Sequence, residues 1–259
     1  MMPLTPWVKR LLIANVVMFA VTTAMPALYE TGALVPRLAL VRPWTLISYM
    51  FLHAGLGHIF FNMLGLFFFG PRLEQRIGEA TFIKLYAWAG LGGALFSILF
   101  APQYPVIGAS AAVQGVLMGF AMFWPRVRIL IYFVLPVEAW LLVLGYVILS
   151  FSYGVGGSRD GIAHFAHLGG LVTGFIYLRW IEWRRGAARR DFQRKVQDIP
   201  SATLSESSAL ERWEAIDLKL MHELNRHEVE TLLRKARALG VGALSADERA
   251  FLDRMTARN

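Results

Sequence analysis

Long apolar segments alternate with short charged clusters along most of the chain. A membrane-spanning helix needs about 20 mostly apolar residues. Six segments approach that requirement, near 8–28, 58–73, 80–100, 109–124, 137–154 and 162–181. The pattern predicts an all-α membrane protein with six transmembrane helices. An even number of crossings also predicts that both ends of this domain lie on the same side of the membrane.

Two boundaries in this pattern depend on proline. The sequence APQYPVIGAS interrupts a charge-free run at 85–125 and divides it into two helices. The apolar segment 128–136 is short and β-branched, so we expect it to lie at the membrane interface. Pro136 suits the first turn of the following helix, and Glu138 would then lie near the positive end of its dipole.

The first external loop, roughly 26–57, is long and rich in Trp, Tyr, Leu and Pro. This composition suggests that it lies on or in the outer membrane interface and is more than a linker. The sequence SYGVGGSRDG at 152–161 is rich enough in glycine to act as a mobile cap.

The composition changes after Arg190, where the chain becomes charged and helix-forming. We expect a membrane domain at 1–185, a basic and polar linker at 186–208, and a cytoplasmic helical tail at 209–259. Two sets of apolar residues in the tail have helical spacing: Trp213, Ile216 and Leu220, and then Val229, Leu232, Leu233 and Ala236. Ser245 followed by Glu248 predicts a capping box at the start of another helix.

Composition supports the membrane prediction. The chain is 56% hydrophobic and 17% charged. This composition and the mean hydropathy of +0.48 argue against an ordinary soluble domain. It contains no cysteine, which excludes disulfides, thiolate metal sites and a cysteine nucleophile. Any nucleophile must therefore be a hydroxyl, a carboxylate or an amine.

The net charge of +8 is compatible in principle with nucleic-acid binding. However, the basic residues form short clusters between apolar segments or lie in the tail, which favours membrane topology and argues against a nucleic-acid partner. One side of the predicted membrane domain carries Lys9, Arg10, Arg72, Arg76, Lys84, Arg126, Arg128, Arg179, Arg184, Arg185, Arg189 and Arg190, whereas the other carries Arg37, Arg42 and Arg159. The positive-inside rule therefore places both termini in the cytoplasm.

Polar residues gather at the outer ends of the second and fourth predicted helices. His58 and Asn62 are four residues apart and share one helix face. Ser110 stands where a loop becomes a helix, so its backbone N–H is among the unpaired donors of a helix start. Structural roles are open for all three, because His58 and Asn62 can bind loop carbonyls and Ser110 can be a simple N-cap.

The sixth predicted helix contributes His167, which shares a face with Gly170 and Gly174. Small residues on that face allow a neighbouring helix to approach closely. His167 could then reach across to the neighbour, or it could be a core histidine bonded to a carbonyl.

The predicted topology places His58, Asn62, Ser110 and His167 at a similar depth in the membrane, because the second, fourth and sixth helices all run inward from the outer side. Ser110 and His167 could form a dyad in which the imidazole accepts the hydroxyl proton and returns it to a leaving amine. His58, Asn62 and the Ser110 N–H suit the negative oxygen of a tetrahedral intermediate. No acidic third member is apparent, and we expect no cofactor and no metal.

At this point the sequence resembles the rhomboid family of intramembrane serine proteases over about 8–181. HAGLGHIFFNM resembles the family's second-helix motif, GASAAVQG its nucleophile motif, and AHFAHLGGLVTG its sixth-helix motif. The resemblance implies that Ser110 is the nucleophile, His167 its base, and His58 and Asn62 the oxyanion residues. His53 would have a more structural role.

Other parts of the chain match the family less completely. The segments RPWTLISYMFLH and LEQRIG resemble its first loop and the turn after its second helix, and the C-terminal segment resembles a helical tail on some bacterial members. Thr45 follows Trp44 where the family often has arginine. Gln114 stands where many members carry an aromatic residue that packs on the catalytic histidine.

The resemblance implies an endopeptidase that cleaves transmembrane segments of other membrane proteins. Its partners would be the lipid bilayer and substrates with helix-breaking residues and a small residue before the cut, and the helix around Trp140 would be a lateral gate. Two alternatives are a non-catalytic relative that binds membrane clients, and a metal site or transporter built on the histidines. The absence of acidic or thiolate ligands in the predicted helices disfavours the latter, and the oligomeric state stays open.

Overall fold

The computed structural model describes residues 3–131, 134–156, 163–198, 206–218 and 221–256. The chain divides into two compact units, Met1–Gly186 and Ala187–Asn259. Both units are mostly helical, and the first contains the residues whose chemistry was considered above.

The long helices of the first unit are α1 (Pro6–Ala24), α4 (Leu56–Ile77), α5 (Glu79–Phe100), α6 (Ser110–Phe123), α7 (Ala139–Val155) and α8 (His164–Asp198), whose last residues fall in the second unit. Each overlaps one of the six apolar segments predicted from the sequence. The boundaries differ most for α8, which continues through the charged residues that follow its apolar part, and thus into the expected linker at 186–208. Pro71 lies inside α4 without ending it.

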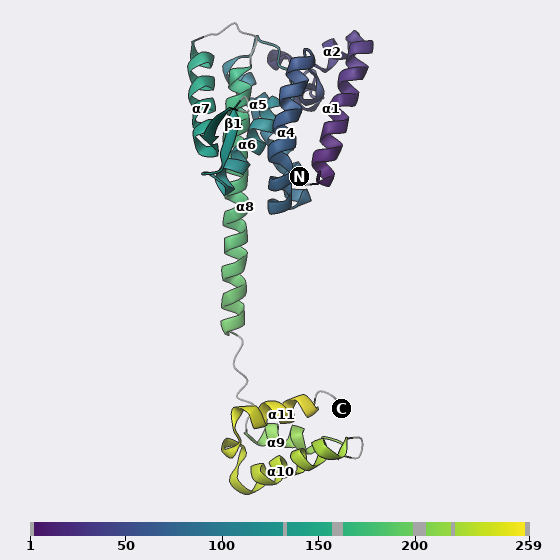
Figure 1. Ribbon diagram of the computed structural model, residues 1–259, viewed down its shortest axis with the longest axis vertical. Helices are drawn as coiled ribbons and strands as arrows, with labels where there is room; N and C mark the ends of the chain where they lie inside the picture. The colour runs from purple at the N-terminus through teal and green to yellow at the C-terminus, as the bar shows by residue number, and fades with distance from the viewer. Residues whose placement is uncertain (1–2, 132–133, 157–162, 199–205, 219–220, 257–259) are drawn as a thin grey trace. The chain divides into compact units, whose positions relative to one another are not determined.

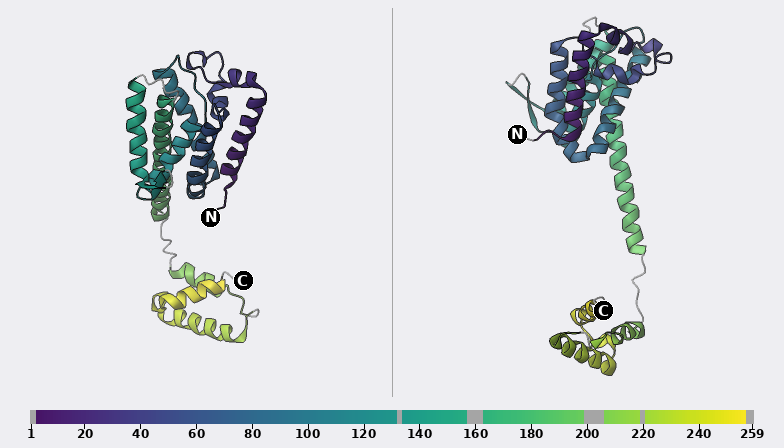
Figure 2. Two further views of the ribbon diagram at one scale, coloured as in Figure 1. Left: turned by 45° about the horizontal axis from the view of Figure 1, so that its top comes forward. Right: turned by 90° about the vertical axis from the view of Figure 1, so that its right-hand side faces the viewer.

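Helix α6 is the most enclosed of these elements. It packs against α5, α4 and α7, and its buried positions include Ala111, Ala112 and Gly115. In Figure 1 and in the left-hand view of Figure 2, α1 and α7 lie at opposite edges of the first unit, with α4, α5, α6 and α8 between them. A helix rich in small residues can occupy this central position because its neighbours can approach its backbone.

The buried carboxylate of Glu74 fixes the start of α1 against α4. It accepts hydrogen bonds from the backbone N–H groups of Trp7 and Val8, each at 3.0 Å, and from the hydroxyl of Thr5. The first N–H groups of a helix have no partners within the helix. Glu74 satisfies two of them from a neighbouring helix and brings negative charge to the positive end of the α1 dipole.

The long loop between α1 and α4 is folded into α2 (Pro26–Gly32), η1 (Pro36–Leu38), α3 (Thr45–Ser48) and η2 (Tyr49–Phe51). Its side chains bind backbone carbonyls in several places. The Trp44 indole donates to the carbonyl of Thr31 at 3.1 Å, and the Thr45 hydroxyl donates to the carbonyl of Arg42 at 2.6 Å. The Tyr49 hydroxyl donates to the carbonyl of Gly90 at 2.7 Å, which ties the loop to α5.

The segment between α6 and α7 forms an antiparallel hairpin of β1 (Arg128–Ile131) and β2 (Leu135–Glu138). The hairpin projects from the side of the helices in the right-hand view of Figure 2. The expectation that Pro136 lies in the first turn of α7 was wrong, because Pro136 pairs with Leu130 in the strand register. The β-branched residues favour the strands, and α7 begins three residues later with Glu138 as its N-cap.

By length and composition, α1, α4 and α5 could each cross a membrane. Helices α6 and α7 are apolar but shorter, and the 14 residues of α6 rise by only about 21 Å. The chain is therefore a helical integral membrane protein.

The second unit contains α9 (Glu206–Glu214), α10 (Glu223–Leu239), η4 (Val241–Ala243) and α11 (Ala246–Thr256). Trp213, Ile216 and the four apolar residues predicted on α10 are buried in its core. Ile216 lies just beyond the end of α9, and Leu220 lies outside the described residues. The predicted capping box is present. The Ser245 hydroxyl accepts from the Glu248 N–H at 3.2 Å, and the Glu248 carboxylate accepts from the Ser245 N–H.

Candidate active site

Ser110 is the first residue of α6, and a glycine controls the approach of the chain to it. Gly108 has a φ of +110°, which L side chains rarely adopt. Its N–H donates to the carbonyl of Tyr49 at 2.8 Å, which anchors this turn to the first loop. The Ser110 side chain is partly exposed, and the first N–H groups of α6 lack partners within the helix.

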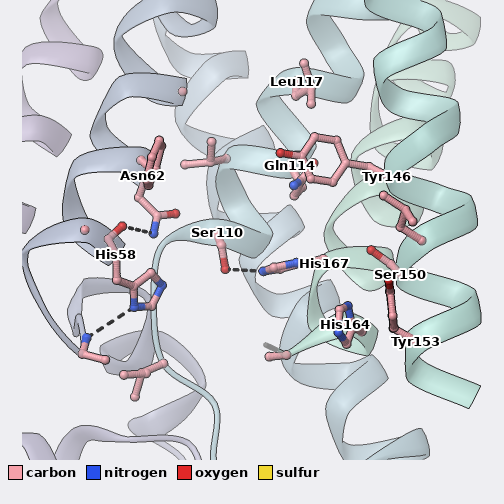
Figure 3. A pocket seen from close by; sticks show the side chains of 18 of the residues that line it. His58, Asn62, Ser110, Gln114, Leu117, Tyr146, Ser150, Tyr153, His164 and His167 are labelled. Carbon is pink, nitrogen blue, oxygen red and sulfur yellow. Dashed lines mark hydrogen bonds between the residues drawn. The ribbon is translucent and has the colours of Figure 1, made fainter. Parts of the chain in front are cut away.

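His167 lies in the first turn of α8 and contacts Ser110 directly. Its Nε2 atom is 2.8 Å from Oγ of Ser110 (Figure 3). This distance is within the range of a good hydrogen bond. Two residues that are 57 positions apart in the sequence are thereby brought into the geometry of a nucleophile and a base.

The close approach of α8 to α6 makes this contact possible. A Cβ atom on Gly170 would collide with the carbonyl of Ala111, and one on Gly174 would lie 2.9 Å from Cα of Gly115. Both glycines lie on the same face of α8 as His167. The prediction that small residues on this face allow close approach of a neighbour is confirmed, and that neighbour is α6.

His58 and Asn62 face the same region from α4. The Asn62 amide donates to the carbonyl of His58 at 2.9 Å, and this side chain is buried. Only one of its two amide hydrogens is used in that bond. Nδ1 of His58 accepts a hydrogen bond from the Ala54 N–H at 3.3 Å. Because a neutral imidazole carries one proton, this contact assigns the proton to Nε2, which becomes a donor.

The Nε2 atom of His58 points toward the turn before Ser110. A Cβ atom on Gly108 would lie 2.6 Å from this nitrogen and 3.7 Å from the Ser110 oxygen. A small space therefore separates the His58 donor from the Ser110 hydroxyl, and residue 108 leaves it open because it has no side chain.

These four side chains line a single cavity of about 1040 Å³, which α7 borders from the other side. The α7 residues on it are Leu142, Tyr146, Leu149, Ser150 and Tyr153, which recur at helical spacing along one face. Figure 3 shows Ser110 and His167 between His58 and Asn62 on one side and the side chains of α7 on the other.

His164 also lines the cavity, where its ring stacks on Tyr153 with 5.3 Å between the centroids. The glycine-rich segment expected to cap the site begins with the last residues of α7, whereas its positions 157–161 lie outside the described residues.

His53 is buried in the loop before α4, and its ring meets that of His58 edge-on at 5.0 Å. Burial, together with the neighbouring His58, lowers the pKa of His53 to about 4. A neutral ring at physiological pH can pack against His58 without charge repulsion, as the structural role suggested for it requires.

The cavity is lined by polar and apolar groups but by no acidic side chain among the described residues. The described part of the chain also holds no group of three or more His, Asp or Glu side chains arranged to bind a metal ion. The side chains that are present, a hydroxyl, imidazoles and amides, suit proton transfer and anion stabilisation.

Sequence reasoning identified Ser110, His167, His58 and Asn62, and the structure brings all four to one cavity. It did not identify Glu74 as the cap of α1, nor the face of α7 that borders the site. The spacing of the α7 residues carries a detectable signal, whereas nothing local to Glu74 indicates that its partners precede it by 66 to 69 positions.

Comparison with known proteins adds an independent finding. Residues 41–184, more than half of the chain, match the Rhomboid domain family. RHOMBOID-like protein 4 of Arabidopsis thaliana is 34% identical over 162 residues, which cover 59% of this chain and 40% of that protein. Rhomboid protease GluP of Bacillus subtilis (strain 168) is 32% identical over 133 residues, covering 51% of this chain and 25% of that protein.

A second protein of the same bacterium, putative rhomboid protease YdcA, is 33% identical over 134 residues, covering 51% of this chain and 64% of that protein. The chain therefore spans less than two thirds of the length of each of these three relatives. The matched region includes every residue that contributes to the cavity.

Proposed function

Because this chain belongs to the rhomboid family of membrane proteins, we propose that it is an intramembrane serine endopeptidase. It cleaves peptide bonds in or near transmembrane segments of other membrane proteins. The observation that carries the proposal is the 2.8 Å contact between Ser110 Oγ and His167 Nε2 in a cavity that also contains His58 and Asn62.

The reaction begins when Ser110 Oγ attacks the scissile carbonyl carbon and its proton passes to Nε2 of His167. The tetrahedral intermediate then collapses, the C–N bond breaks, and the imidazolium returns the proton to the leaving amine. An acyl-enzyme remains on Ser110. Water attacks it with His167 again as the base, which releases the new carboxyl terminus and restores the serine hydroxyl.

Three donors stabilise the negative oxygen of the tetrahedral intermediate. They are Nε2–H of His58, the second amide hydrogen of Asn62, and the backbone N–H of Ser110 at the start of α6. The assignment of the His58 proton to Nε2 supports this role, since that nitrogen is directed toward the turn before Ser110. Removal of one such donor typically lowers kcat by about 100- to 1000-fold.

The cavity border supplied by α7 is consistent with entry of a substrate segment between α4 and α7. The lateral gate is then α7, the helix that carries the exposed Trp140. A helix must unwind before its carbonyl can meet Ser110, because its backbone groups are otherwise bonded within the helix. Substrates therefore contain helix-breaking residues near the cut, and the family resemblance implies a small residue before it.

The membrane arrangement belongs to the same proposal. Helices α1, α4, α5, α6, α7 and α8 all cross the bilayer, with both termini in the cytoplasm of a bacterial cell and the Ser110 end of α6 toward the outside. The membrane domain occupies 1–185, and the linker at 186–208 joins it to the tail at 209–259. The protein acts without a metal or cofactor, and its partners are lipid and transmembrane substrates.

The proposal is tested by incubating the purified full-length protein in detergent with a transmembrane test substrate. The parent protein, the Ser110→Ala variant and the parent with added chelator are compared by the appearance of cleaved product. We expect cleavage by the parent with and without chelator, and none by Ser110→Ala.

Cleavage that persists in Ser110→Ala would refute the serine mechanism. Loss of cleavage in chelator would favour a metal site. If the parent binds the substrate without cutting it, the non-catalytic client-binding alternative replaces the proposed protease.

A further inference from the structure

Gln114 brings an unsatisfied polar group to the wall of the cavity. It follows Ser110 by four residues on α6, so both side chains emerge from nearly the same helix face. Its side chain is 8% exposed, and Oε1 is buried without a hydrogen-bond partner. Gln114 nevertheless lines the cavity that contains Ser110 and His167, and Figure 3 shows it on the side of α6 that faces Tyr146.

An orphaned carbonyl of this kind is uncommon, because burial of an acceptor without a donor costs free energy. Val113 and Leu117, its neighbours on α6, are apolar, and the Tyr146 side chain that Gln114 faces makes no hydrogen bond to Oε1. The terminal amide torsion of glutamine is soft, so a small rotation can present Oε1 to a donor that enters the cavity. A hydrogen bond from a bound hydroxyl would restore the free energy that burial of Oε1 costs.

Distance limits which part of a substrate can supply that hydroxyl. Four residues of helix separate Ser110 and Gln114 by about 6 Å along the axis. A substrate carbonyl carbon bonded to Ser110 Oγ has the Cβ of its own residue about 2.5 Å away. Gln114 lines the same cavity one helical turn from Ser110, so the residue immediately before the scissile bond is the part of the substrate that we infer to lie nearest to it.

We propose that Gln114 selects substrates with serine immediately before the scissile bond, by accepting a hydrogen bond from the serine hydroxyl. The inference rests on the proposed proteolytic function and names the substrate preference of that site. Serine is small enough for the space beside Ser110, and it supplies the donor that the amide lacks. Alanine in the same place fits equally well but leaves the Gln114 carbonyl unsatisfied.

The test uses two transmembrane peptides that differ only by serine or alanine before the cut. Their kcat/KM values are measured with the full-length parent, with Gln114→Met and with Gln114→Leu. We expect the parent to prefer serine by about threefold to tenfold, the range of one neutral hydrogen bond. The preference should fall to about one in both variants, because methionine and leucine fill the space without an acceptor.

Leu117→Met is the matched control, since it places methionine at a neighbouring position on the same wall. It should retain the preference for serine. Equal kcat/KM values for the serine and alanine peptides in the parent would overturn the proposal. A serine preference that survives in Gln114→Met would also overturn it. If Gln114→Met fails to fold, as judged by size-exclusion chromatography, Gln114→Leu and the parent decide the question.

A binding measurement separates this inference from the proposed function. Both peptides, labelled with a fluorophore, are titrated into the Ser110→Ala protein in detergent micelles, where no cleavage can occur. Tighter binding of the serine peptide, lost on adding Gln114→Met, supports the inference whether or not the parent cleaves. Equal binding together with equal cleavage contradicts it, while absence of cleavage alone counts against the protease proposal.

Discussion

A side chain on Gly108 would fill the space between the Nε2 atom of His58 and the hydroxyl of Ser110. The Cβ atom would lie 2.6 Å from that nitrogen, closer than real Cβ contacts allow. Gly108 also has a φ of +110°, so the turn needs glycine for its backbone as well as for the space. The absence of a side chain at this residue is therefore part of the proposed oxyanion site.

We expect Gly108→Ala to lower proteolytic activity by at least about 100-fold, because displacement of catalytic groups by about 1 Å is enough for such a loss. The matched control is Gly78→Ala. Gly78 has a φ of +88° but has no atom within 4 Å of the position of a Cβ, so it tests backbone strain without the collision. Cleavage assays on both variants, with thermal unfolding to check their folding, separate the two effects. Equal activity losses in equally folded variants would contradict the assignment.

Replacement of Asn62 by alanine should weaken catalysis without abolishing it. The proposed contribution is one hydrogen bond to the negative oxygen, and its removal should lower kcat by about 100- to 1000-fold. Ser110→Ala removes the nucleophile and should leave no measurable cleavage. Turnover of a transmembrane substrate by the two variants gives the comparison. If both were folded and equally inactive, the division of roles between Asn62 and Ser110 would need revision.

The packing of α8 on α6 predicts that substitution of a glycine that touches no substrate will lower proteolytic activity. A Cβ on Gly170 would collide with the carbonyl of Ala111, so Gly170→Ala should push α8 outward and separate His167 from Ser110. Activity should fall by about 100-fold or more, and the thermal midpoint should drop. Gly145→Ala on α7 is the control, because no atom lies within 4 Å of its Cβ position. Near-parental activity of Gly170→Ala would show that the contact tolerates a wider helix spacing.

The six apolar helices and the four candidate site residues could be predicted from the sequence, because each depends on a local signal. Hydropathy marks a helix, and the spacing of His58 from Asn62 marks a shared face. The hairpin β1–β2 was not predicted, since a short apolar segment with a proline has no strong period. The orphaned carbonyl of Gln114 was also beyond prediction, because it depends on which groups the neighbouring helices fail to supply.

The cap that Glu74 provides to α1 makes it a strong determinant of stability. Glu74→Ala would leave the Thr5 hydroxyl and the N–H groups of Trp7 and Val8 without their acceptor in a buried position. Hydrogen bonds to charged groups contribute about 1.5–3 kcal/mol each, so we expect a loss of about 3 kcal/mol or more. Thermal unfolding in detergent measures it.

Glu79→Ala is a suitable control for Glu74→Ala, because Glu79 is an exposed acidic residue in the first turn of α5. It should change the stability far less. Equal destabilisation by the two substitutions would show that the loss of a nearby negative charge, and not the loss of the cap, is responsible.

The second unit should lose part of its stability in acid through Glu248. Its carboxylate accepts hydrogen bonds from Lys235 Nζ at 2.7 and 2.9 Å and from the Ser245 N–H. The Lys235 hydrogen bond, followed by that of Ser245, holds the pKa of Glu248 below its ordinary value of 4.5. Because the folded state favours the carboxylate, this stabilisation is fully present above about pH 4.5 and is lost as pH falls through the lower folded pKa.

We therefore expect Glu248→Gln to reduce the hydrogen-exchange protection of α11 at pH 7 in the full-length protein. The difference between parent and variant should shrink once the pH falls below about 4.5, because the parent then loses the same charge. Glu228→Gln, at an exposed position on α10, should leave protection near the parental value. A difference between parent and Glu248→Gln that stays constant into acid would mean that the carboxylate charge does not hold the start of α11. The capping box would then act through its geometry alone.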